Sequence, residues 1–183
     1  MRYSMEELWN LQENLFDDPR LPDILRIIDS FPKPKSKSIR TSEEHLISVL
    51  WGFHMEQEAL IALRSKGYEA DLIDAEHHDT LSTMPRELTR LNDIVVNGVE
   101  YDIKSWHNLE SYVFPKYVTD KPTLDVVPWD GRWEIHFTGV RTMANAKEKA
   151  MESHYVKFLP MHPGCLDYME RMKRKLWEIK RKS

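Results

Sequence analysis

The order of the sequence patterns predicts an α+β or α/β fold, in which a central mixed β-sheet is flanked by helices. Three observations lead to this prediction: helical patterns that begin at capping boxes, a group of short β-like runs after them, and two further helical patterns at the end of the chain. With 183 residues, the chain is long enough for one domain with a real core. We therefore predict a single domain, with the core over about residues 42–138, helices and a basic linker over 1–40, and helices over 142–182.

Two capping boxes predict the starts of the first helix and of the central helix. Residues 4–7, Ser-Met-Glu-Glu, open a helix expected over about residues 4–17, and Pro22 opens a shorter helical turn that runs to Ile28. Residues 41–44, Thr-Ser-Glu-Glu, open the central helix, which Gly67 is expected to end. This central helix should pack one broad apolar face on the sheet.

Two more helices are predicted over about residues 142–157 and 165–181. The second one carries a single apolar stripe made of Leu166, Met169, Met172, Leu176 and Ile179. A stripe of this kind indicates a core contact or a homodimer contact rather than a chemical role.

The composition excludes several classes of protein. Hydrophobic residues make up 41% of the chain and charged residues 31%, which is typical of a globular protein and not of a disordered or fibrous one. No stretch approaches the roughly 20 apolar residues that a membrane helix needs, and the first residues are acidic where a signal peptide would be basic and apolar. Cys165 stands alone, so neither an internal disulfide nor a cysteine zinc site is expected. We expect a cytoplasmic protein without a membrane partner.

Basic residues are unevenly distributed along a chain whose net charge is −4. They concentrate in residues 33–40 and again in residues 171–175 and 180–182. Such runs are usually linkers or solvated helix faces, and contact with phosphate is the alternative.

Five short runs have the composition of β-strands: residues 68–73, 93–96, 99–104, 124–127 and 133–137. Asn97-Gly98 lies between the second and the third run and predicts a two-residue type I′ hairpin. In that register Val96 faces Val99, and Asp93 faces Asp102.

Alternation along the two strands sorts the side chains of this hairpin onto two faces. The apolar face, which we expect to be buried, consists of Ile94, Val96, Val99, Tyr101 and Ile103. The other face carries Asp93, Asp102 and Lys104. Two opposed carboxylates about 5 Å apart repel each other, and a divalent cation or the nearby lysine would offset the repulsion. The alternative is an ordinary hairpin with a polar outer face that binds nothing.

The segments Asn92-Asp93 and Asp102-Ile103-Lys104 together resemble the motif of the PD-(D/E)xK nuclease superfamily, which has the restriction-endonuclease-like fold. Asn92 stands where the family has proline, and Asp102 stands where glutamate is more common. The family also has a glutamate on the helix before these strands, and residues 56–67 look like that segment. Helical spacing favours Glu56 over Glu58, because Glu56 falls at the margin of the buried face. A solvated helix glutamate is the alternative. The resemblance covers about residues 42–138.

The resemblance implies a metal-dependent endonuclease that hydrolyses phosphodiester bonds in nucleic acid, with DNA favoured over RNA. Asp93, Asp102, Glu56 and the carbonyl group of Ile103 would hold Mg²⁺ or Mn²⁺, and Lys104 would position the attacking water and stabilise charge on the phosphate.

Two other functions stay open at this stage. One is an RNA endonuclease of the viral cap-snatching kind, for which only His45 or His54 offers the additional histidine ligand on the central helix. The other is a nuclease-fold protein that binds nucleic acid or protein without cleaving. The histidines at positions 54, 77, 78, 107 and 136 receive no role from the sequence, because isolated histidines are usually packing or surface groups.

Overall fold

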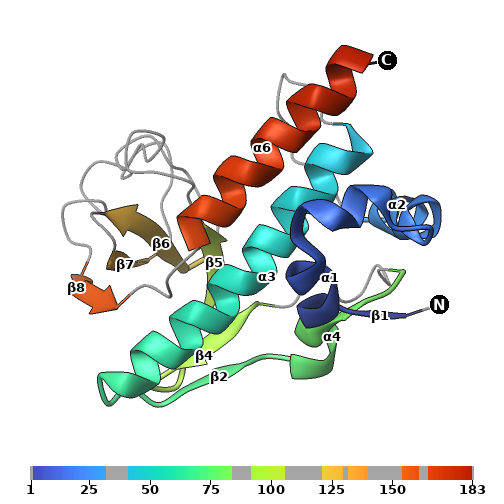
Figure 1. Cartoon of the computed structure of the whole chain (residues 1–183). Helices are drawn as coiled ribbons and strands as arrows, with labels where there is room; N and C mark the ends of the chain where they lie inside the picture. Colours follow the sequence, from blue (N-terminus) through green and yellow to red (C-terminus); the bar gives the residue numbers. More distant parts are fainter. Residues whose placement is uncertain are drawn as a thin grey trace, which may run out of the picture. The chain divides into compact units, whose positions relative to one another are not determined.

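The computed structural model describes residues 2–31, 41–83, 92–105, 121–129, 132–139, 154–160 and 165–182, and it has an α+β fold (Figure 1). The chain divides into two compact units. The first comprises Met1–His54, Asp74–Leu91 and Gly164–Ser183, and the second comprises Met55–Ile73 and Asn92–Pro163. The division falls inside the central helix, α3 (Ser42–Ser65). In the described part of the chain, no helix is both long enough and apolar enough to cross a membrane.

The first unit is mainly helical. Its elements are β1 (Tyr3–Ser4), α1 (Met5–Leu11), the 3₁₀ helix η1 (Gln12–Asp17), α2 (Leu21–Ile28), the first part of α3, α4 (Ala75–Asp79), β3 (Thr80–Leu81) and α6 (Cys165–Lys182). β1 and β3 form a short antiparallel pair, which the sequence did not predict. Neither was α4 predicted, because a five-residue helix gives too little periodicity to recognise. The core of this unit includes the fully buried side chains of Leu8, Leu15, Ile24, Ile28 and Leu46.

The predicted helix over residues 4–17 is interrupted in the structure. Ser4 caps its start as expected, since its hydroxyl accepts a hydrogen bond from the Glu7 amide at 3.3 Å. Gln12 has a φ of 52°, which an α-helix cannot contain, and the chain continues as η1. The apolar spacing of Leu8, Leu11 and Leu15 predicted the helix but not the break; Leu8 and Leu15 are buried and Leu11 is half-buried.

The central helix α3 follows the prediction closely. Its capping box is reciprocal: the Glu44 amide donates to the Thr41 hydroxyl at 3.2 Å, and the Thr41 amide donates to the Glu44 carboxylate at 2.9 Å. Gly67 has a φ of 87°, the left-handed conformation that ends helices. The beginning and the end of α3 are therefore set by local signals.

The C-terminal region holds one confirmed prediction and one correction. On α6, Met169 and Met172 are buried, and Tyr168 stacks on Trp9 with ring centroids 3.7 Å apart, so the stripe forms a core contact. The side chain of Leu166 lies outside the described residues. The predicted helix over 142–157 falls mostly on residues 140–153, also outside the description, but its end is wrong, because β8 (His154–Pro160) is a strand. Antiparallel pairing with a neighbouring strand outweighs the helical pattern there.

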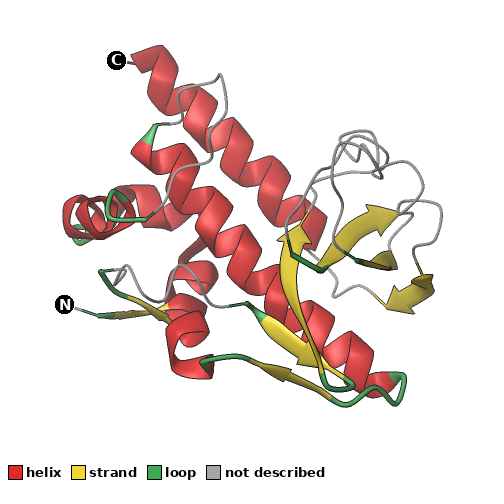
Figure 2. Cartoon of the chain, turned by 180° about the vertical axis from the view of Figure 1, so that it is seen from behind, coloured by secondary structure: helices red, strands yellow, loops and turns green. Residues whose placement is uncertain are grey.

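The second unit contains a mixed six-stranded sheet in the order β2-β4-β5-β6-β7-β8 (Figure 2). Its strands are β2 (Ala70–Leu72), β4 (Ile94–Val96), β5 (Val99–Ser105), β6 (Thr123–Trp129), β7 (Arg132–Thr138) and β8. β5 and β6 are parallel, and all other neighbours are antiparallel. All five strands predicted from the sequence are present, with shifts of a few residues at their ends.

One face of this sheet is apolar. Ile94, Val96 and Ile103 are buried, as the alternation predicted. Val99 is a correction, because 47% of it is exposed at the tip of the hairpin, directly after the turn. Tyr101 is half-buried against the edge of the Phe137 ring, with centroids 5.4 Å apart. Alternation gives the side on which a residue lies but not how far the covering layer extends.

Candidate functional site

The β4–β5 hairpin has the turn and the register that its sequence predicts. Asn97 and Gly98 have φ values of 47° and 81°, both in the left-handed region that a type I′ turn requires. Val96 pairs with Val99, Val95 with Glu100, and Ile94 with Tyr101. The turn is also held from outside: Asn97 donates its amide to the Glu69 carbonyl at 2.7 Å.

Asp93 lies just before β4 and is tied to both neighbouring strands. Its amide donates to the Tyr101 carbonyl at 3.0 Å, and its carbonyl accepts from the Ile73 amide at 2.9 Å. Its carboxylate oxygen Oδ2 accepts a hydrogen bond from the Ile103 amide at 2.7 Å. The side chain is therefore oriented by the backbone on which Asp102 and Lys104 stand.

The backbone of Ile103 faces Asp93 as well. The Asp102 amide donates to the Pro122 carbonyl at 3.0 Å, so the polar groups of Asp102 point toward β6. Because backbone groups of successive strand residues point to opposite sides, both the amide and the carbonyl of Ile103 point toward the Asp93 side. The Ile103 carbonyl is thus on the edge where the sequence predicted a ligand.

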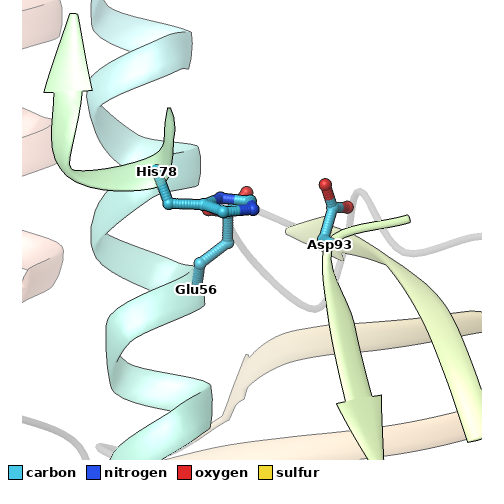
Figure 3. A group of neighbouring side chains, drawn as sticks. All are labelled: Glu56, His78 and Asp93. Atoms are coloured by element: carbon cyan, nitrogen blue, oxygen red, sulfur yellow. The ribbon is translucent and has the colours of Figure 1, made fainter. Parts of the chain in front are cut away.

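The second half of α3 brings Glu56 to the same place. Glu56 and Asp93 offer carboxylate oxygens that lie within 4.8 Å of each other. Figure 3 shows Glu56 reaching out from the helix toward the start of β4, where Asp93 lies. Two half-buried carboxylates at this separation repel each other unless a cation or a proton lies between them. The third side chain labelled in Figure 3, His78, belongs to α4 in the first unit.

Glu58 has a different environment from Glu56. It is 9% exposed, and its carboxylate accepts a hydrogen bond from the indole nitrogen of Trp133 at 3.4 Å. Two residues on a helix point about 200° apart, so only one of these two glutamates can reach the hairpin. The structure gives that position to Glu56, the residue that helical spacing favours.

Asp102 is paired with two lysines. Its Oδ2 lies 3.8 Å from Nζ of Lys104, and its Oδ1 lies 3.9 Å from Nζ of Lys121. The side chains of both lysines are partly exposed, 41% for Lys104 and 34% for Lys121, so these ion pairs stabilise the fold little. Their effect is to place two positive charges on the Asp102 carboxylate. The sequence did not single out Lys121, because the pairing of β5 with β6 that brings it to Asp102 is long-range.

A row of polar residues extends from Lys104 across the sheet. Lys104 is in register with Asp125 on β6, and Asp125 is in register with His136 on β7. Asp125 is completely buried. Burial lowers the pKa of His136 to about 4, and its Nε2 lies 3.2 Å from the Glu134 carboxylate.

A second row runs parallel to the first. Asp102 is in register with Thr123, and Thr123 is in register with Thr138. Both threonines are buried, and their hydroxyl groups hydrogen-bond to each other at 2.5 Å. The sequence did not identify either row, because isolated polar residues in β-like runs usually face solvent.

The two histidines that a cap-snatching endonuclease would use have other surroundings. His45 is 4% exposed within the first unit. The His54 ring stacks on the indole of Trp9, with centroids 3.9 Å apart and planes tilted by 10°. His107 lies outside the described residues.

No family model, no curated protein and no solved structure matches this chain. The residues and their geometry are therefore the basis for assigning a function.

Proposed function

We propose that the second unit carries a metal-dependent endonuclease site that hydrolyses phosphodiester bonds in nucleic acid, on a restriction-endonuclease-like core. One observation carries this proposal: Glu56 from the helix and Asp93 from the start of β4 present carboxylate oxygens within 4.8 Å of each other. Asp102 and Lys104 stand on the adjacent strand, whose Ile103 amide orients the Asp93 carboxylate.

The chemistry of the donor set fits Mg²⁺ or Mn²⁺. Of the predicted carboxylates, the structure brings Glu56 and Asp93 within 4.8 Å of each other, whereas Asp102 is not part of that cluster and pairs with Lys104 and Lys121. Glu56, Asp93 and the Ile103 carbonyl offer oxygen, the ligand that these hard cations prefer, and would hold the ion together with Asp102 from the adjacent strand. When bound, it supplies Lewis-acid stabilisation of the phosphate and a water of lowered pKa.

The remaining steps belong to the side chains of the protein. The Lys104 ammonium lies at the same edge as the carboxylates and would stabilise the negative charge that develops on the phosphate. Asp102 holds this ammonium in place from 3.8 Å. Lys121, on the other oxygen of Asp102, is available to a neighbouring phosphate of the substrate.

DNA is the favoured substrate, by frequency within the family that the motif resembles. The cleavage assay therefore includes both nucleic acids, and cleavage of RNA alone would assign the site to RNA.

The test is cleavage of end-labelled single- and double-stranded DNA and RNA with Mg²⁺, with Mn²⁺, and with EDTA. We expect cleavage only with a metal, and a loss of at least about 10²-fold in rate for Asp93→Asn and for Glu56→Gln. Glu100→Gln is the matched control, because Glu100 is an exposed carboxylate on the same hairpin and lies outside the site. Cleavage that continues in EDTA, or binding without cleavage under every condition, would refute the proposal.

Metal binding has an independent measurement. A cation that binds only the folded protein stabilises it by mass action, so Mn²⁺ should raise the melting temperature. The rise should disappear in Asp93→Asn and persist in Glu100→Gln. An unchanged melting temperature in the wild-type protein would show that the four oxygen groups do not bind the ion.

A further inference from the structure

The outward face of α6 in the first unit combines positive charge with an exposed aromatic ring. The helix carries seven basic residues, Arg171, Lys173, Arg174, Lys175, Lys180, Arg181 and Lys182, and three acidic ones, Asp167, Glu170 and Glu178. It is thus strongly positive in a chain whose net charge is −4. A basic helix of this kind is usually a solvated face, and an exposed aromatic ring within it favours the alternative, contact with a negative partner.

Trp177 stands in the middle of this charge. At about 100° per residue, Lys173, Trp177 and Arg181 follow one line along the helix, within an arc of about 80°, and Arg174 lies beside them. The exposed Glu170 falls within the same arc and Glu178 borders it, so three cations and two carboxylates surround the ring. This face points away from Met172, which is buried. Trp177 is 58% exposed, although the other large apolar residues of the described part of α6 are buried or half-buried.

The basic residues of α6 fall into two groups. Those on the flanks are paired within the first unit: Lys175 lies 3.6 Å from the Asp17 carboxylate, Arg171 lies 3.2 Å from Asp167, and Lys180 contacts Glu44. Lys173 and Arg174, beside Trp177, are exposed, and in the described part of the chain no acidic side chain lies within ion-pair distance of them. Arg174 also lines a pocket with Glu13, Asp17 and Glu178, so Lys173 has fewer acidic neighbours than Arg174. The guanidinium of Arg181 lies over the Trp177 ring, 4.6 Å from its centroid.

We propose that this face, made of Lys173, Arg174, Trp177 and Arg181, binds single-stranded nucleic acid. An exposed aromatic ring among cations is the arrangement that such proteins use, because a base stacks on the ring while the cations contact the phosphates. The Arg181 guanidinium lies over the Trp177 ring, where a base would stack, and its positive charge adds to the attraction for the nucleic acid. A membrane surface is disfavoured, since a single Trp without apolar neighbours on the same face gives no stripe that could enter a bilayer.

This surface belongs to the first unit and the proposed nuclease site to the second, and the test of the surface needs no cleavage. The probes are a fluorescein-labelled 20-nucleotide single-stranded DNA of mixed sequence and the corresponding duplex, measured by anisotropy in EDTA with the full-length protein. We expect Trp177→Ala to weaken the single-strand affinity about 5- to 100-fold, by loss of base stacking. Trp177→Phe should retain part of it.

The charge contribution is tested by the triple variant Lys173→Gln, Arg174→Gln and Arg181→Gln. It should lower the slope of log affinity against log salt by about 2, since each lost phosphate contact on a single strand removes about 0.7. The matched control removes three exposed cations elsewhere, Arg2→Gln, Arg26→Gln and Lys66→Gln, and should leave the slope nearly unchanged.

Three results would overturn this inference: equal losses in the two triple variants, no effect of Trp177→Ala, or duplex affinity that equals the single-strand affinity and does not need the ring. Flotation with vesicles of 30% phosphatidylserine in phosphatidylcholine tests the competing partner, a membrane surface. Binding to these vesicles that depends on Trp177, in preference to the oligonucleotide, would also overturn it.

Discussion

The two faces of strands β5, β6 and β7 are built from different kinds of residue. One face consists of apolar side chains such as Ile103, Leu124 and Ile135, of which the last two are fully buried. The other carries Asp102 and Lys104 at its open edge and the completely buried Asp125 further in. The same three strands therefore bury both an ordinary core and a set of charged groups.

This difference teaches which face contributes stability and which contributes chemistry. Each fully buried Leu or Ile side chain stabilises a fold by about 1.5 to 3 kcal/mol. A buried carboxylate costs several kcal/mol unless it is paired and hydrogen-bonded. The polar face is therefore the face on which the function proposed above would depend.

The largest expected effect is that of Lys104→Ala on the polar face. Turnover should fall about 10²- to 10³-fold, because the charge developing on the phosphate loses its stabilising ammonium. The free energy of unfolding should change by less than about 1 kcal/mol, since the lost pair with Asp102 is partly exposed. Single-turnover cleavage and urea unfolding measure the two quantities. Lys104→Arg should not restore the rate, because a planar fork replaces a compact ammonium. A Lys104→Ala protein that cleaves at the wild-type rate would make this face a salt-bridged surface.

The matching change on the apolar face should have the opposite signature. Leu124→Ala leaves a cavity at a fully buried position and should lower the free energy of unfolding by about 3 kcal/mol. The cleavage rate per folded molecule should stay within a few-fold of wild type. Thr123→Val, its neighbour on the polar face, removes the hydroxyl pair with Thr138 and should cost only about 1 kcal/mol. If Leu124→Ala lost activity while remaining folded, the division between the faces would be wrong.

A third prediction concerns the pH dependence that the polar face imposes on stability. Burial lowers the pKa of His136 to about 4, whereas an unfolded histidine has a pKa of about 6.5. Below pH 6.5 the unfolded state binds a proton that the folded state does not, so this contribution to stability is present above 6.5 and is lost as the pH falls toward 4. In wild type, the free energy of unfolding in urea should fall between pH 7 and pH 4.5. In His136→Gln this fall should be smaller by about 2 kcal/mol. The same pH dependence in both proteins would mean that His136 is protonated in the folded state.

The smallest effect is expected for Lys121→Gln, at the edge of the polar face. If Lys121 contacts a substrate phosphate, KM should rise by roughly 2- to 5-fold and the salt dependence of binding should weaken by about one phosphate contact, with kcat unchanged. Steady-state cleavage at several salt concentrations gives both values. A fall in kcat instead would place Lys121 with Lys104 at the reacting phosphate.

Much of the fold was predictable, because it depends on residues that are close together in the sequence. The Thr41–Glu44 box and Gly67 bound the central helix, and the two-residue turn Asn97-Gly98 fixes the hairpin register locally. The break at Gln12 was not predictable, since the apolar spacing continues through it. Val99 was placed on the correct side of its strand, but its exposure depends on a layer that ends before the turn.

The candidate site shows the same division. The sequence by itself determined the motif Asp93, Asp102 and Lys104, because two-residue turns and strand alternation are local. It also favoured Glu56 over Glu58, because helix periodicity fixes which of two neighbouring glutamates can face the hairpin.

Only the tertiary structure decided which charges meet. The approach of Glu56 to Asp93, the pairing of Lys121 with Asp102, and the burial of Asp125 and His136 beside Lys104 all require elements that are distant along the chain. Parallel pairing of β5 with β6 and packing of α3 are set by the collective burial of apolar area, which no short sequence pattern records.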